Sequence, residues 1–167
     1  MEAGKKNITM PIAWLGGLAL ALGTFTASAA SPASLTSGRA KYVFLFIGDG
    51  MAMPQISSAE VYAEAMTSKA IAVKRLSFTQ FPVPGLTTTY DAGSFVTDSA
   101  SAGTALATGH KTLNGVINMD PAKTRTCKTL AQYAHEKGMK VGIVTTVSLD
   151  HATPACFHAK TPSRGNY

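Results

Sequence analysis

Charged residues are scarce in this chain of 167 residues: Asp, Glu, Lys and Arg make up only 14% of it, while hydrophobic residues make up 46%. This composition excludes a disordered tail and a coiled coil, because both are rich in charge. Acidic residues are rarer than basic ones: the chain has nine Asp and Glu and fifteen Lys and Arg, which gives a net charge of +6. No aromatic residues alternate with the small basic groups, as a groove for single-stranded nucleic acid would require. We therefore expect no nucleic acid as a specific partner.

An apolar run long enough to span a bilayer is also missing from the N-terminal region. The apolar residues 8–22 fall short of the roughly 20 residues that a spanning helix needs. Two lysines precede this run and Ala27-Ser28-Ala29 follows it, which is the order of elements in a secretory signal peptide. We predict a signal peptide over residues 1–29 and a polar leader over 30–40. The protein would then be exported, periplasmic or secreted, without a permanent membrane anchor.

Cysteine is rare, since the chain has only Cys127 and Cys156. After export both residues would reach an oxidising compartment, where a disulfide is permitted. Their separation in the sequence does not give their distance in space, so a disulfide and two buried thiols remain equal alternatives.

Residues 41–167 alternate between strand and helix patterns. The opening strand is a continuous apolar run that ends in Gly-Asp-Gly, which is typical of a strand buried on both faces. The alternation predicts an α/β protein, with a layered sheet of mostly parallel strands and helices on both faces. Strands are predicted at 42–47, 85–90 and 140–146, and helices at 54–68, 99–108, where Gly109 provides the C-terminal cap, and 126–137, where Thr126 is the N-cap.

Polar side chains follow two of these predicted strands. Asp49 comes directly after the first strand, at the carboxyl edge of the sheet, where α/β proteins usually bind ligands. An ordinary turn aspartate is the alternative. His151 and Thr153 follow the strand at 140–146 and place nitrogen and oxygen ligands at the same edge. Asp150, beside them, is expected to be a solvated loop carboxylate.

Ser99 begins the Ala-rich helix, where free N–H groups and the positive end of the helix dipole favour an alkoxide or a phosphate. Helix capping is the alternative use of a serine here. No G-x-S-x-G motif surrounds Ser99, which argues against the usual acyl-transferring hydrolase. A divalent cation held by Asp49 would instead lower the pKa of the hydroxyl. Arg164 offers paired donors suited to two phosphoryl oxygens.

Four motifs followed by Arg164 occur in one order: FIGDGM at 46–51, VTDSASAGTALATGHKT at 96–112, NGVI at 114–117 and VGIVTTVSLDHATPA at 141–155. In this order they resemble the alkaline phosphatase family. The long serine block beside the histidine block is more specific than either motif alone. The resemblance implies an alkaline-phosphatase-like fold that is incomplete here, because members of the family are far longer. Residues 41–167 would be the N-terminal part of a single such domain.

The resemblance also implies roles for the residues that handle the phosphate. Ser99 would attack the phosphorus and become a transient phosphoserine. Arg164 would hold the substrate phosphate, and Asp98 would position that arginine. The protein would hydrolyse phosphomonoesters, and the full-length protein would be a candidate homodimer, as members of the family are.

Zinc and magnesium are the cofactors that the resemblance implies. Asp49 would contact a zinc ion and the magnesium ion, and Thr153 would bind magnesium. His151 would touch the water shell of the magnesium. The other zinc ligands of the family lie in the later part of its sequences, so we expect the 167-residue chain alone to have little or no activity.

Two other functions remain open from the sequence. Related metal-dependent phosphodiesterases, sulfatases and phosphomutases share a nucleophile near a strand-end aspartate, although Arg164 favours a monoester, of whose free oxygens it can bind two. An exported, non-catalytic domain that binds phosphate at the Ser99 helix is the second alternative.

Overall fold

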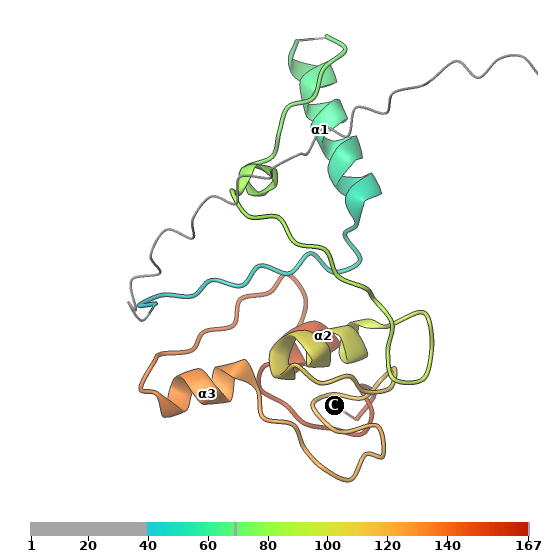
Figure 1. The fold of residues 1–167 in the computed structure, drawn as a ribbon, viewed down its shortest axis with the longest axis vertical. Helices are drawn as coiled ribbons and strands as arrows, with labels where there is room; N and C mark the ends of the chain where they lie inside the picture. Colours follow the sequence, from blue (N-terminus) through green and yellow to red (C-terminus); the bar gives the residue numbers. More distant parts are fainter. Residues whose placement is uncertain (1–39, 69, 167) are drawn as a thin grey trace, which may run out of the picture. The chain divides into compact units, whose positions relative to one another are not determined.

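The computed structural model describes residues 40–68 and 70–166, so the predicted signal peptide and nearly all of the predicted leader lie outside the described residues. Residues 45–167 group as one compact unit, apart from the unit that ends at Phe44. None of the helices in the described part is both long and apolar enough to cross a membrane. The helices are α1 (Met53–Thr67), a short 3-10 helix (Phe78–Gln80), α2 (Ser99–Thr108), α3 (Leu130–Glu136) and α4 (Ala152–Ala155) (Figure 1).

Helix α2 has the bounds that the sequence predicts, because both of its end signals are local. The Asp98 side chain caps the N-terminus by accepting a hydrogen bond from the backbone N–H of Ser101 at 2.9 Å. Gly109 ends the helix with a φ of 74°, a left-handed conformation that glycine adopts without steric cost. The prediction for α1 is also confirmed to within one residue at each end.

The start of α3 was predicted wrongly, since Thr129 caps this helix instead of Thr126. The Thr129 hydroxyl accepts from the Gln132 N–H at 3.1 Å, and the Gln132 side chain accepts from the Thr129 N–H at 3.0 Å. This reciprocal capping box needs Gln or Glu three residues after the cap. Thr126 has Thr129 at that position, so it cannot form the pair.

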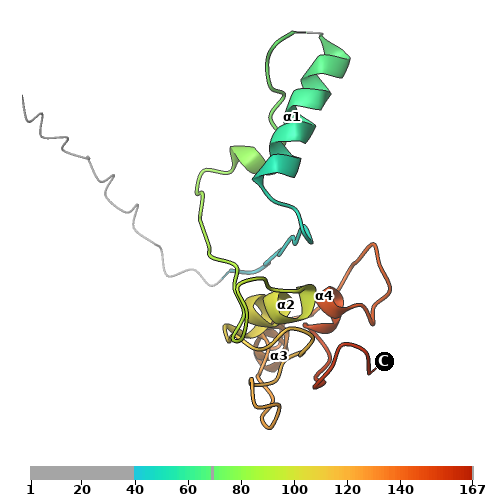
Figure 2. The same ribbon diagram turned by 90° about the vertical axis from the view of Figure 1, so that its right-hand side faces the viewer.

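The small core lies where α2 packs against α4 (Figures 1 and 2). Gly103 of α2 faces Cys156, and a methyl group at Gly103 would lie only 2.8 Å from the Cys156 Sγ. The close approach of the two helices therefore depends on small residues in α2. The buried hydrophobic residues of this core are Ala100, Ala107, Ile117, Ala152, Ala155 and Cys156.

The layered sheet is not formed among the described residues, whose only β-pairings are two isolated bridges, Ile117–Thr161 and Met119–Thr126. The segments predicted as strands carry side chains that are largely exposed, such as Phe46 (86%), Leu86 (104%) and Val144 (99%). A strand must pair its N–H and C=O groups with a neighbour. The three segments predicted as strands have no such neighbour in the described part of the chain, so their backbones form no ladder of hydrogen bonds between strands. The short helix α4 and the 3-10 helix were not predicted.

Candidate active site

The Asp49 carboxylate is the point where three distant segments meet. It lies in the turn between Gly48 and Gly50, and Gly50 has a φ of 65°. Asp49 Oδ2 accepts a hydrogen bond from Ser99 Oγ at 3.0 Å and another from Thr153 Oγ1 at 2.9 Å. The Ser99 hydroxyl also lies 3.2 Å from Oδ1. One exposed carboxylate therefore gathers two hydroxyls from two different helices.

The two hydroxyls are positioned by the packing of their helices. Ser99 is the first residue of α2, so its Oγ lies at the end of the helix where the N–H groups are free. Thr153 lies between the buried residues Ala152 and Pro154 in α4, the helix that packs against α2. The contact between α2 and α4 thus sets how the two hydroxyls face Asp49.

A second cluster begins at Asp98, immediately before Ser99. Arg164 Nη1 donates to Asp98 Oδ2 at 3.1 Å, with the two side chains 35% and 26% exposed. The same carboxylate accepts from the Ser101 N–H and hydroxyl, both at 2.9 Å, and from the Gly115 N–H at 3.0 Å. Partial burial raises the pKa of Asp98, but the hydrogen bonds from Ser101, Arg164 and Gly115 outweigh it and leave the pKa below its usual range. Asp98 therefore stays ionised and holds the guanidinium.

Asn114 also belongs to this cluster, although its place in the NGVI motif at 114–117 does not predict a role for it. Its Oδ1 accepts from the Asp98 N–H at 2.7 Å and lies 2.9 Å from the Ser101 Oγ. Its Nδ2 donates to the Val96 carbonyl at 2.9 Å and lies 3.3 Å from Ser94 Oγ. Asn114 thus ties the chain on both sides of the α2 N-terminus. The only sequence signal was an Asn-Gly pair, which by itself indicates a turn.

His151 lies at the N-cap of α4, and its Nδ1 is buried without a hydrogen-bond partner among the described residues. It lines a recess of about 210 Å³ together with Ser148, Asp150 and Arg164. The recess therefore joins the loop before α4 to the arginine held by Asp98. His151 makes no hydrogen bond to Asp49, Ser99 or Thr153 in the described region.

The oxygen donors around Asp49 suit a hard divalent cation, since one carboxylate and two hydroxyls already lie within hydrogen-bonding distance of one another. The Nδ1 of His151 is a further buried polar atom without a hydrogen-bond partner among the described residues. The set is incomplete, however, because no group of three or more His, Cys, Asp or Glu side chains comes together in residues 40–68 and 70–166. The described residues fit part of a metal site.

Both cysteines are free thiols in the structure, so the disulfide alternative is not the one observed. Cys156 is buried in the core, whereas Cys127 is half-buried. Burial raises the pKa of the Cys156 thiol to about 11. Cys156 is therefore a packing residue of the contact between α2 and α4.

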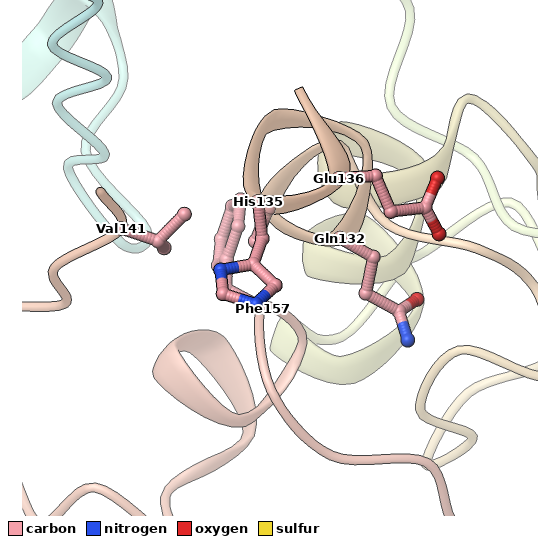
Figure 3. Close-up of a pocket in the computed structure, with 6 residues that line it drawn as sticks. Gln132, His135, Glu136, Val141 and Phe157 are labelled. Carbon is pink, nitrogen blue, oxygen red and sulfur yellow. The ribbon is translucent and has the colours of Figure 1, made fainter. Parts of the chain in front are cut away.

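A larger pocket of about 340 Å³ lies elsewhere, beside α3 (Figure 3). Figure 3 shows His135, Gln132 and Glu136 of α3 around it, together with Val141 and Phe157. None of the six predicted site residues lines it. Its size alone therefore does not make it the reactive site.

The chain belongs to the alkaline phosphatase family, whose model matches residues 40–167. Among curated relatives, Alkaline phosphatase 4 of Drosophila melanogaster is 33% identical over 128 residues, which are 72% of this chain and 22% of that protein. Streptomycin-6-phosphate phosphatase of Streptomyces griseus is 38% identical over 146 residues, which are 83% of this chain and 31% of that protein. The chain thus spans less than a third of the length of either relative.

Solved structures give the fold and point to a metal. A cold-active alkaline phosphatase from the psychrophile Shewanella sp. matches with a TM-score of 0.64 and 40% identity, over 72% of this chain and 30% of that one. The described part therefore has an alkaline-phosphatase-like fold. A variant of the alkaline phosphatase from the Antarctic bacterium TAB5, with magnesium bound in its M3 site, matches with a TM-score of 0.54 and 32% identity over 65% of this chain and 30% of that one.

Proposed function

We propose that this chain carries the nucleophile and the phosphate-binding residues of a metal-dependent phosphomonoester hydrolase that works through a phosphoserine at Ser99. The observation that supports this most is the 3.0 Å approach of Ser99 Oγ to Asp49 Oδ2 at the N-terminus of α2. Thr153 donates to the same carboxylate. A capping serine would not need a carboxylate and a second hydroxyl beside it, whereas a nucleophile next to a cation site would.

In the first step, Ser99 Oγ bonds to phosphorus while the bond from phosphorus to the leaving oxygen breaks, and the leaving alcohol takes up a proton. Water then attacks the phosphoserine from the vacated side, releases phosphate and returns the proton to Ser99. The free N–H groups at the start of α2 favour the charged phosphoryl oxygens. When bound by Asp49 and Thr153, magnesium and zinc would supply charge neutralisation and favour the serine alkoxide.

Arg164 supports a monoester as the substrate. A monoester has three non-bridging oxygens, one more than a diester, so a guanidinium can present paired donors to two of them while the third stays free for a cation. Arg164 Nη1 is held by Asp98, so its position is fixed before substrate binds. Streptomycin-6-phosphate phosphatase, among the relatives, is named for one such monoester.

The finer features of fold and location belong to the same proposal. The segments at 42–47 and 140–146 would be parallel strands of a layered sheet once partner strands lie beside them, in the length that the relatives have beyond this chain. We propose that residues 1–29 are a signal peptide and 30–40 a leader, and that the mature protein is exported and forms a homodimer. Residues 41–167 would form part of one catalytic domain.

The test uses the protein expressed from its complete coding sequence, with zinc and magnesium supplied. Ser99→Ala should lower the turnover of p-nitrophenyl phosphate at least about 10³-fold, because the nucleophile is lost. Acid-trapped phosphoserine should disappear with it. Ser57→Ala, an exposed serine of α1, is the matched control and should change neither readout.

Three outcomes would contradict the proposal: full turnover by Ser99→Ala, a phosphoserine at another position, or faster hydrolysis of diesters or sulfate esters than of monoesters. Phosphate binding without any turnover by the complete protein would favour the non-catalytic alternative. The 167-residue chain assayed in parallel should have little or no activity.

A further inference from the structure

The recess beside Arg164 contains a charged residue, Asp150, that has no role in the proposed phosphate chemistry. Its lining contains two ionised side chains, Asp150 and Arg164, beside Ser148 and His151. Arg164 already has an ion-pair partner in Asp98, 3.1 Å away. Asp150 is exposed and has neither an ion pair nor a side-chain hydrogen bond in the described part of the chain. The recess therefore contains a carboxylate that no described residue holds by an ion pair or a side-chain hydrogen bond.

This carboxylate would share the recess with the substrate. A recess of about 210 Å³ has the volume of roughly seven water molecules, which is more than a phosphoryl group needs. Part of the alcohol that the phosphate esterifies would therefore lie in the same space. Charges in one recess are closer than the screening length of about 8–10 Å, so Asp150 would act on any charge that the alcohol carries.

We propose that Asp150 is a specificity residue that favours phosphomonoesters whose alcohol carries a positive charge, such as an amine or a quaternary ammonium group. The inference rests on the proposed function, because it assumes that the phosphate is held at Arg164. Asp150 attracts the cationic group, and the same charge opposes the binding of free phosphate, a dianion. The carboxylate takes no part in bond making or breaking.

The experiment compares two substrates with the same shape on the complete, metal-loaded protein. Phosphocholine carries a quaternary nitrogen, and 3,3-dimethylbutyl phosphate has a neutral carbon in its place. Asp150→Asn should lower the ratio of their kcat/KM values about 3- to 10-fold, and this difference should shrink at high salt. Inorganic phosphate should inhibit the variant about threefold more strongly than the wild type.

Glu136→Gln is the matched control, because it removes one negative charge from α3 outside the recess. It should leave the substrate ratio unchanged. An unchanged ratio in Asp150→Asn, or an equal loss for both substrates, would overturn the inference and leave Asp150 as a solvated loop residue or a structural one. Hydrolysis of p-nitrophenyl phosphate by the wild type separates the two proposals. If it persists while the ratio stays unchanged, only the specificity inference fails; if it is absent, the proposed function fails first and the inference with it.

Discussion

Helix α1 is longer than α2, but α2 is the more deeply buried of the two. Helix α1 has fifteen residues, none of which is buried, whereas α2 has only ten, of which five are buried. The buried residues of α2 are small, and one of them, Gly103, lies against Cys156. The shorter helix is thus the one with tertiary partners, and it is the one that carries Ser99. Packing of small residues, more than helix length, fixes the candidate nucleophile.

Polar contacts inside the core reinforce this difference. The buried Thr104 hydroxyl of α2 donates to the Val116 carbonyl at 3.3 Å and accepts from the Asn118 N–H at 2.9 Å. The Asn118 side chain in turn donates to the carbonyls of Cys156 and Ala159 at 2.6 and 2.8 Å. These bonds connect α2 to the loop that follows it and to the end of α4. Among the described residues, the side-chain hydrogen bonds of helix α1 are all exposed or half-buried.

The largest effect that tests the comparison is the loss of a core side chain. Ile117 is completely buried in the cluster with α2 and α4. Ile117→Ala should lower the free energy of unfolding by about 3 kcal/mol, because it removes buried methyl groups and leaves a cavity. Met66→Ala is the control in α1, where the side chain is 68% exposed, and should change stability by less than about 0.5 kcal/mol. Urea unfolding of the 167-residue chain measures both, and equal losses would contradict the difference between the two regions.

The same contrast explains what the sequence could predict. The bounds of α2 depend on Asp98 and Gly109, which act on their immediate neighbours, so a local pattern was sufficient. The sheet depends on partner strands far away in the chain, so the apolar run at 42–47 could indicate a strand without showing what pairs with it. The described residues leave that segment exposed.

The candidate site shows a similar division. Asp49 and Ser99 could be brought together from the sequence because Asp49 follows a predicted strand and Ser99 begins a predicted helix. The structure places Ser99 Oγ 3.0 Å from Asp49 Oδ2. Asn114 could not be found in this way, because its amide bonds to backbone groups 16 and 18 residues earlier. An asparagine in a turn has the same local pattern whether or not it reaches such partners.

Removal of the Asn114 amide is the next largest test. Asn114→Ala should lower the free energy of unfolding by about 2 kcal/mol, because it removes the hydrogen bonds to the Asp98 N–H and the Val96 carbonyl, each worth about 1 kcal/mol. Both groups keep a second partner, the hydroxyls of Ser101 and Ser94. Gln55→Ala in α1 removes one exposed, local bond to the Ala52 N–H and should cost less than about 1 kcal/mol. Urea unfolding compares the two variants. A smaller loss for Asn114→Ala than for Gln55→Ala would show that the α2 N-terminus is held by the core alone.

The smallest effect concerns the thiol buried between α2 and α4. Burial raises the pKa of Cys156 to about 11, above that of a thiol in the unfolded chain. The folded state therefore holds its proton more tightly, and this stabilisation is complete below the unfolded pKa and is lost as the pH rises through the folded one. With a pKa of about 9 for the thiol in the unfolded chain, the loss at pH 10 is about 1.4 kcal/mol.

Cys156→Ala should consequently flatten the decline of stability between about pH 9 and pH 11, even though it lowers stability at neutral pH by leaving a small cavity. Cys127→Ala, at the half-buried cysteine, should keep the slope of the wild type. Alkylation at pH 9 gives a second readout, because the thiolate is the reactive form and Cys127 should react before Cys156. Equal alkylation rates would mean that the contact between α2 and α4 opens readily. Packing of these two helices could then not explain how Ser99 is held in place.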